Sequence, residues 1–300
     1  MAEDIRDKPT IEAADVKALN FVNEAAPFVF RKHHRQGLRS HIMEILDPVD
    51  VKIERSGMVI DGVRCFPRAR PRRMFRLFRS RLKTLDRALN EIGRVKIVEQ
   101  YLAPNFMATS VECIVDYHGP KGWDLMLCGF QEYVQGEVLD PWSILGKAEL
   151  LPSLFDQLKS GVKAISPSKN QWISTVRNNG QQFVEKIKQM IIHAGHIPDL
   201  AGAGNLILTA EGDIRLVDIN NISRVDFSGS ISLDEKGYPV CDKSVEALAL
   251  IEEKIVGRKA DRHDKLFKLF LDPKRWEAVK AQEALFWKRR SSGIGADPKH

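Results

Sequence analysis

The sequence lacks the residue patterns that define several large classes of metal-binding and secreted proteins. Its four cysteines are Cys65, Cys113, Cys128 and Cys241. They show no C-x-x-C spacing, so their pattern indicates neither a zinc site nor a disulfide framework. His33 and His34 are adjacent but have no acidic or cysteine partner nearby in the sequence. We therefore expect both histidines to be solvated rather than to bind a metal.

Long apolar runs are also missing. No stretch approaches the roughly 18 consecutive apolar residues of a membrane-spanning helix, so no transmembrane segment is expected. The first residues, MAEDIRDKPTIEAAD, are charged and contain no apolar run, which is not the pattern of a secretory signal. Together with the scattered cysteines, these absences favour the reducing cytoplasm.

The charge of the chain is distributed unevenly. The 300 residues are 43% hydrophobic and carry a formal net charge of +6; a chain of this length forms one large domain or two modest ones. Ten lysine or arginine residues stand from Arg64 to Arg87, against one acid, Asp86. Such a segment indicates a polyanionic partner, such as a nucleotide, a phosphorylated substrate, an acidic membrane surface or nucleic acid.

The periodicity of residues 72–92 predicts a helix with two different faces. Apolar residues recur at intervals of three and four from Met74 to Ile92, as on an amphipathic helix, and Gly93 would end it. The basic stripe of this helix is Arg72, Arg76, Arg79, Lys83 and Arg87. It is either a solvated face or a site for an anionic ligand or surface. Nucleic acid is not the expected partner, because no nucleic-acid motif is present and few aromatic residues interleave the charges.

Strands and further helices are expected around this segment. Alternating apolar residues predict strands at 49–53, 58–66, 111–117 and 124–134. A long helix is predicted over 175–193, and another starts at Asp242 or Ser244. Asp272 and Pro273 form an N-cap and first-turn pair for the last helix.

The segment 196–221 places three oxygen-bearing side chains at the ends of two short apolar runs. The runs predict two strands joined by a tight turn, at 206–209 and 214–217. A hairpin puts the residue entering its first strand beside the residue leaving its second. We therefore expect Asn205 and Asp218 to lie together, with Asp199 reaching in from the preceding loop. Two carboxylates and an amide oxygen are suitable ligands for an Mg²⁺ ion that also binds phosphate. The alternative is an ordinary hairpin in which these Asp and Asn residues only cap turns.

These residues resemble the catalytic region of the protein-kinase-like superfamily. That region reads H-R-D-L-x-x-x-N and is followed by a hairpin and a metal-binding Asp. Here the match is Asp199-Leu200, Asn205 and Asp218. The departures are one additional residue before Asn205, Asp-Ile-Asn in place of D-F-G, and a histidine three residues before Asp199. These departures are more common in the divergent, often bacterial, small-molecule kinases of the superfamily than in eukaryotic protein kinases.

A second segment resembles the kinase hinge. Residues 130–137 read FQEYVQGE, against the common hinge form M-E-Y-V-x-G-G-E. By this resemblance, Gln131 takes the gatekeeper place, and the carbonyl of Glu132 and the amide of Val134 contact the adenine of ATP.

The resemblance implies an α+β, two-lobed fold, with a small β-rich lobe over residues 1–134 and a mainly helical lobe over 135–300. Apart from the resemblance, residues 1 to about 20 are expected to form a mobile or loosely docked N-terminal arm. Asp199 would be the catalytic base, and Asn205 and Asp218 would bind Mg²⁺. The protein would transfer phosphate from ATP to a hydroxyl, and we expect a small molecule or sugar as the acceptor.

The phosphate-binding parts of a kinase are not plain in this sequence. It contains no G-x-G-x-x-G loop, and no lysine lies between Lys52 and Lys83. Arg64 or Lys52 would have to replace the strand lysine, although arginine and lysine differ in reach and geometry. The helix glutamate would be Glu91, with Glu99 as the second choice. Two alternatives stay open: a pseudokinase that binds a nucleotide or a partner without catalysis, and a polyanion-binding module that uses helix 72–92.

Overall fold

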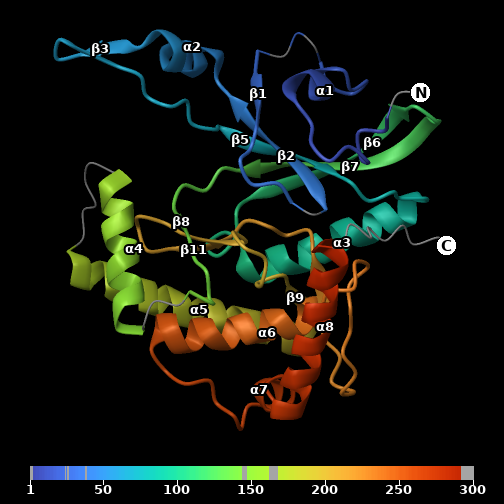
Figure 1. Ribbon diagram of the computed structural model, residues 1–300, viewed down its shortest axis with the longest axis vertical. Helices are drawn as coiled ribbons and strands as arrows, with labels where there is room; N and C mark the ends of the chain where they lie inside the picture. Colours follow the sequence, from blue (N-terminus) through green and yellow to red (C-terminus); the bar gives the residue numbers. More distant parts are fainter. Residues whose placement is uncertain are drawn as a thin grey trace. The chain divides into compact units, whose positions relative to one another are not determined.

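A computed structural model describes residues 3–23, 25, 27–37, 39–143, 147–161 and 168–291. The chain is a mixed α/β protein with an antiparallel sheet (Figure 1). It divides into two compact units: unit 1 contains Met1–Gly93 and Ala108–Tyr133, and unit 2 contains Arg94–Met107 and Val134–His300. The segment Arg94–Met107, placed in the first domain by the sequence, thus packs with unit 2.

Unit 1 is built on a five-stranded antiparallel sheet. Its order is β1-β2-β5-β7-β6, with β1 (Val29–Lys32), β2 (Ser40–Leu46), β5 (Arg73–Phe78), β7 (Gly122–Glu132) and β6 (Ser110–Gly119). The predicted hairpin over 111–134 is confirmed, because β6 and β7 pair along their full length and turn between Gly119 and Gly122.

The N-terminal residues cover one face of this sheet rather than forming a loose arm. Helix α1 (Ala13–Lys17) buries Val16 completely, and Ile11 is also buried. Both pack in one cluster with Phe75 and Met126 of the sheet. Apolar burial therefore holds residues 5–19 on the sheet, and the expectation of a mobile or loosely docked arm was wrong.

The predicted helix over 72–92 is wrong in its first half. Arg73–Phe78 is strand β5 of the large sheet, and the helix, α3 (Leu85–Leu102), begins seven residues later and continues through Gly93. Every residue of β5 after Arg73 is buried. A strand buried on both faces reads as a continuous apolar run, which periodicity cannot separate from a helix. The basic residues Arg72, Arg76, Arg79, Lys83 and Arg87 therefore share no helix face.

Arg76 shows most clearly why no basic stripe exists. Its side chain is 2% exposed and pairs with Glu112 at 2.8 Å. Arg76 lies opposite Gly129 of β7, and Gly129 lies opposite Glu112 of β6. Because Gly129 has no side chain, the guanidinium can pass over β7 to reach the carboxylate on the next strand. A Cβ at position 129 would come within 3.4 Å of Arg76 Nη2.

Residues 49–53 were expected to form a strand but belong to helix α2 (Pro48–Ser56). Asp47 caps this helix by accepting the N–H of Val49 at 2.7 Å, and Pro48 occupies its first turn. This N-cap and proline pair outweighed the short apolar alternation. The following strands, β3 (Met58–Ile60) and β4 (Val63–Cys65), pair only with each other among the described strands.

Unit 2 is mainly helical. Its described helices are the part of α3 from Arg94 onward, α4 (Lys147–Gly161), α5 (Lys169–Ala194), α6 (Val240–Ile251), the π-helical segment η1 (Glu252–Val256), α7 (Lys265–Phe270) and α8 (Pro273–Ser291). The predicted long helix over 175–193 lies inside α5, and the last helix starts at Pro273 as predicted. Asp242 and Ser244 do not cap α6 but are buried within it. None of the described helices is long and apolar enough to cross a membrane.

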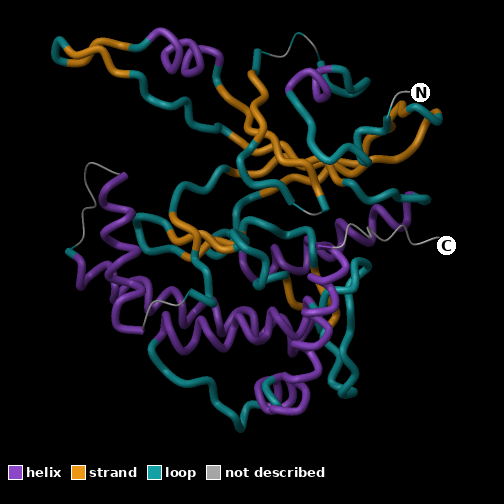
Figure 2. Tube along the Cα trace, viewed as in Figure 1, coloured by secondary structure: helices purple, strands orange, loops and turns teal. Residues whose placement is uncertain are grey.

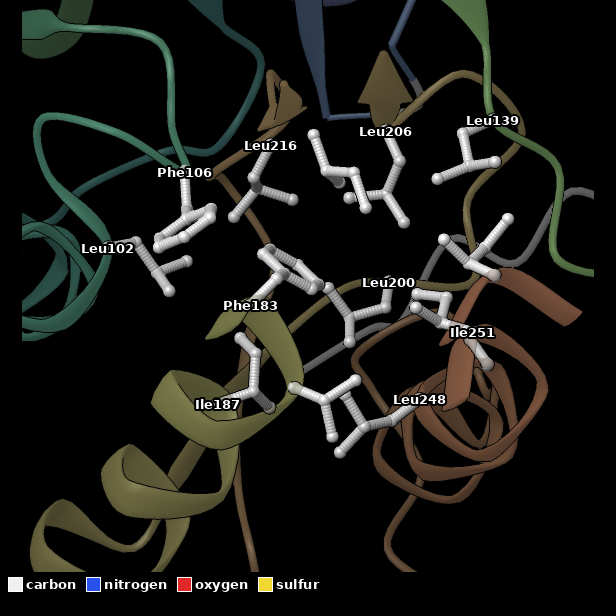
Figure 3. Packing of buried hydrophobic residues seen from close by; sticks show 14 of the residues in the cluster. Leu102, Phe106, Leu139, Phe183, Ile187, Leu200, Leu206, Leu216, Leu248 and Ile251 are labelled. Atoms are coloured by element: carbon white, nitrogen blue, oxygen red, sulfur yellow. The ribbon is translucent and has the colours of Figure 1, made fainter. Parts of the chain in front are cut away.

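Short strands lie among these helices and share their core. They are β8 (Glu137–Val138), β9 (His196–Pro198), β10 (Leu206–Leu208), β11 (Ile214–Leu216) and β12 (Ile222–Arg224). Figure 3 shows Phe183 of α5 and Leu248 of α6 packed around Leu200, beneath Leu206 and Leu216 of the hairpin. The core thereby fixes both the hairpin and the loop before it.

The buried pair between Arg76 and Glu112 yields a stability prediction. Removing one partner of a buried ion pair leaves an uncompensated charge and costs about 3–5 kcal/mol. Arg76→Gln should therefore lower the free energy of unfolding by that amount, measured by urea denaturation. The matched control is Arg87→Gln, because Arg87 is exposed on α3 and surface substitutions stay within about 0.5 kcal/mol. Equal small effects for the two variants would contradict the position of Arg76 in the sheet.

Candidate functional site

The hairpin of β10 and β11 brings Asn205 and the residues before Asp218 together. The strands pair in the register Leu206 to Leu216 and Leu208 to Ile214, which confirms the predicted hairpin. One step beyond the strands, the N–H of Val217 donates to the carbonyl of Asn205 at 2.8 Å. Asn205 and Asp218 are therefore held at the same open end of the hairpin.

A second strand pair positions Asp199. Strand β9 pairs with β12, and Pro198 lies opposite Ile222. Directly after this pair, the N–H of Asp199 donates to the carbonyl of Asn221 at 2.8 Å. Because Asn221 stands three residues after Asp218, this bond ties the Asp199 loop to the segment that carries Asp218.

The loop between Asp199 and Asn205 is held by side chains as well as by backbone. The amide nitrogen of Asn205 donates to the carbonyl of Asp199 at 2.8 Å. The hydroxyl of Ser244, on α6, accepts the N–H of Leu200 at 3.1 Å. A Cβ at Gly202 would lie 2.4 Å from Nδ2 of Asn205, so the glycine leaves the space that Asn205 occupies.

The carboxylate of Asp199 is oriented and electrostatically strained. Its Oδ1 accepts the N–H groups of Ala201 at 2.9 Å and Gly202 at 3.0 Å. Its Oδ2 accepts Nδ2 of Asn221 at 3.3 Å. Burial and then the negative charge of Asp218 raise the pKa of Asp199 from 3.8 to about 6, although these hydrogen bonds oppose the rise. The negative charge of Asp218 therefore disfavours ionisation of Asp199, in addition to the effect of burial.

The side-chain oxygen atoms of Asn205 and Asp218 are suitable ligands for a hard divalent cation. Since the nitrogen of Asn205 is used by the loop, its Oδ1 is the atom left to bind a ligand, and no described residue donates to it. Oδ1 of Asp218 accepts the N–H of Asn220 at 3.1 Å. Within the described chain, Oδ2 of Asp218 accepts no hydrogen bond. Amide and carboxylate oxygens are the ligands of Mg²⁺. A cation here would also offset the repulsion between Asp199 and Asp218.

The sequence analysis missed two residues of this site, Asn221 and Ser244. Asn221 bonds Asp199 through both its backbone and its side chain, and Ser244 reaches the loop from 44 residues away along the chain. Asn221 lies inside the segment singled out by the sequence, so the Asp-Ile-Asn-Asn run could have indicated it. Nothing local marks Ser244.

The other residues predicted to bind ATP belong mostly to unit 1. Lys52 and Arg64 are exposed, on α2 and β4, and Arg64 donates to the carbonyl of Ser56 at 2.9 Å. The strand on which Lys52 was expected is helical, so its predicted place on a phosphate-facing strand is lost. Glu91 lies in α3 and Glu132 ends β7, both in unit 1, whereas Val134 begins a segment of unit 2.

His33 and His34 have an acidic neighbour that their sequence surroundings do not reveal. Pairing of β1 with β2 brings Glu44 close, and the possible ligand atoms of the three residues lie within 4.8 Å of one another. However, Glu44 also accepts Nε of Arg31 at 2.6 Å and lies 3.9 Å from Arg68. These arginines already neutralise the carboxylate, so the hairpin site is the better metal candidate.

His196 does not lie beside Asp199 in the way expected of a histidine in a kinase catalytic loop. It lines a cavity of about 460 Å³ in unit 2 together with Arg94 and Arg224. None of Asp199, Asn205 and Asp218 lines this cavity. Nδ1 of His196 is 2.6 Å from the carbonyl of Ala194, so the histidine is held by backbone and takes no part in orienting Asp199.

No protein-family model matches the chain, and a search of curated proteins finds no match either. The interpretation of the site therefore depends on its geometry and on the motif that the sequence carries.

The strained carboxylate yields a pH-dependent stability prediction. Because the folded-state pKa of Asp199 is raised to about 6 from 3.8, folding favours its protonated form. The ionisation of Asp199 therefore lowers the free energy of unfolding progressively as pH rises from about 4 to about 6. Above about pH 6 this destabilisation is complete. Asp199→Asn should stabilise the protein by about 1–3 kcal/mol at pH 7.5 without Mg²⁺, and by little at pH 4.

Urea denaturation at both pH values measures this difference. The matched control is Glu211→Gln, an exposed carboxylate in the turn of the same hairpin. We expect the control to match wild type at both pH values. A variant Asp199→Asn that is less stable than wild type at pH 7.5 would show that Asp218 does not strain this carboxylate.

Proposed function

We propose that the protein is an ATP- and Mg²⁺-dependent phosphotransferase that acts on a hydroxyl of a small molecule or sugar. The observation that carries this proposal is the convergence of Asp199, Asn205 and Asp218 at one end of a hairpin in unit 2. Two carboxylates and one amide oxygen held this way match the oxygen ligands and base of a phosphoryl-transfer site.

Asn205 and Asp218 are the metal-binding residues in this proposal. When bound, Mg²⁺ supplies positive charge to the transferring phosphates. The chain contributes the placement of its two ligands: the bond from Asn205 Nδ2 to the loop leaves Oδ1 of Asn205 for a ligand, and the N–H of Asn220 fixes Oδ1 of Asp218. Both ligands are therefore oriented before a cation arrives.

Asp199 is the catalytic base. Its Oδ1 is occupied by two backbone N–H groups, whereas Oδ2 takes the longer bond from Asn221. Oδ2 is the oxygen that receives the proton of the acceptor hydroxyl while the hydroxyl oxygen attacks the γ-phosphorus and ADP leaves. A pKa of about 6 keeps the carboxylate mostly ionised at neutral pH, near the optimum for a general base.

The order of elements supports a protein-kinase-like arrangement as part of the same proposal. One helix, α3, stands in the chain between β5 and β6 of the five-stranded sheet, and the hairpin with the catalytic loop follows the long helix α5. This order is similar to that of the two lobes of a kinase. The adenine contacts of Glu132 and Val134, and the phosphate contacts of Lys52 or Arg64 with Glu91, stay predictions.

A second candidate is a pseudokinase that binds nucleotide without catalysis. The sequence observation that favours it is the missing glycine-rich loop and strand lysine. The polyanion-binding alternative loses its basis, because the basic helix 72–92 on which it depended does not exist.

Metal-dependent nucleotide binding tests the ligand assignment. Asp218→Asn should lower the affinity for Mg-ATP at least tenfold, because a neutral amide cannot supply the charge of the carboxylate. Isothermal titration with and without Mg²⁺ measures the affinity, with Glu211→Gln as the control. Wild-type affinity for Mg-ATP in Asp218→Asn would show that the metal ligand is another residue.

Turnover tests the base and separates the kinase from the pseudokinase. Asp199→Asn should lower the rate of ADP release against a panel of hydroxyl acceptors by roughly 10²–10⁴-fold, while the affinity for Mg-ATP stays near that of wild type. Binding of Mg-ATP by wild type without turnover on any acceptor would favour the pseudokinase. Unchanged turnover in Asp199→Asn would contradict the role given to this carboxylate.

A further inference from the structure

Strands β3 and β4 form a small hairpin that stands apart from the five-stranded sheet of unit 1. Figure 2 shows this hairpin directly after helix α2. Its two strands pair with each other and with no other described strand. The turn is Asp61-Gly62, and both residues have positive φ, 49° and 78°. This is the backbone of a tight two-residue hairpin turn, so the hairpin is a defined element and not an irregular loop.

One face of the hairpin is wholly apolar. Met58 lies opposite Cys65, and Ile60 lies opposite Val63. Residues directly opposite each other, and residues two apart on one strand, point to the same face. The apolar face of the hairpin is therefore Met58, Ile60, Val63 and Cys65. Val59 and Arg64 form the other face.

This apolar face is left uncovered. Met58 is 40% exposed, Ile60 46% and Val63 62%. On the other face, Val59 is 62% exposed, and Phe66, two residues after Arg64, is 59% exposed. Single exposed apolar residues are common, but a contiguous apolar group on a projecting element marks a contact surface for a partner or a membrane.

Taken together, the segments before and after the hairpin contain more basic residues than acids. Residues 48–72 contain six lysine or arginine residues and three acids. Lys52 and Arg55 are exposed on α2, and Arg68 is 67% exposed after β4. Of the acids, Glu54 is neutralised by Arg31 at 2.9 Å. At physiological salt, exposed charges act over about 8 Å, so basic residues next to the hairpin in the chain can add to its attraction for an anionic surface.

We propose that this hairpin docks the protein on an anionic lipid bilayer, with its apolar face lying in the interface. The combination of a small apolar surface with a basic flank is what interfacial binding requires, because apolar burial and attraction to anionic headgroups act together. A flat orientation keeps Asp61 at the edge of the contact. Gly57 (φ 74°) sets how the hairpin leaves α2, since a Cβ there would lie 2.9 Å from Arg64 Cγ.

A bilayer is a better match than a protein partner for two physical reasons. Strands of three residues offer little edge for pairing with an added strand. A standard protein interface covers about 800 Å² on each partner, which is large for four side chains. A bilayer needs no matching shape, and its negative surface complements the basic flank.

Vesicle co-sedimentation of the full chain tests the proposal. We expect binding to vesicles with 30% anionic phosphatidylglycerol in phosphatidylcholine, about tenfold weaker binding to phosphatidylcholine alone, and loss of binding as salt rises. The variant Ile60→Thr with Val63→Thr keeps strand propensity but removes the apolar face, and it should bind anionic vesicles at least tenfold more weakly. Arg55→Gln with Arg68→Gln should lose most of the salt-dependent binding.

The matched control replaces one isoleucine and one valine that are also exposed but lie outside the hairpin. It is Ile192→Thr with Val111→Thr, at 76% and 54% exposure, and it should bind as wild type does. Equal binding of the hairpin variant and the control, or no binding of wild type to anionic vesicles, would overturn the proposal. A wild-type dimer in sedimentation velocity that becomes monomeric in the hairpin variant would instead assign the face to a second copy of the chain, and would overturn it too.

Discussion

Two backbone hydrogen bonds hold the candidate site together. One joins the N–H of Val217 to the carbonyl of Asn205, and the other joins the N–H of Asp199 to the carbonyl of Asn221. Together they hold Asp199 and Asp218 at the same end of the hairpin, where burial and then the charge of Asp218 raise the pKa of Asp199 to about 6. This raised pKa is a cost to folding above about pH 6, and in the proposed function a bound cation would offset it.

The helices of unit 2 provide the rigidity that this arrangement needs. Phe183 and Ile187 of α5 pack against the loop and hairpin through Leu200, as Figure 3 shows, and Ser244 of α6 fixes the N–H of Leu200. Apolar packing and a side-chain hydrogen bond therefore hold the same short loop. A site with this support is oriented before its ligands bind, which is the main requirement for phosphoryl transfer.

The sequence predicted the local parts of this structure and failed where distant segments decided it. The β10–β11 hairpin, the long helix α5 and the start of α8 followed from turn residues, periodicity and an Asp-Pro pair. Strand β5 was mistaken for a helix because both of its faces are buried. Ser244, the partner of Leu200, and Glu44, the partner of His33, belong to other elements of the chain. No local sequence pattern therefore predicts these contacts.

The central claim is that Asp199 and Asp218 share a space built for a divalent cation. Carboxyl ¹³C NMR of aspartate-labelled protein measures it most directly, with the Asp199 resonance assigned by its loss in Asp199→Asn. The account predicts a pKa near 6 for Asp199 without metal, and a clearly lower pKa when Mg²⁺ and ATP are added, because the cation offsets the charge of Asp218. An Asp199 pKa near 3.8 without metal, or one that Mg²⁺ and ATP leave unchanged, would contradict it.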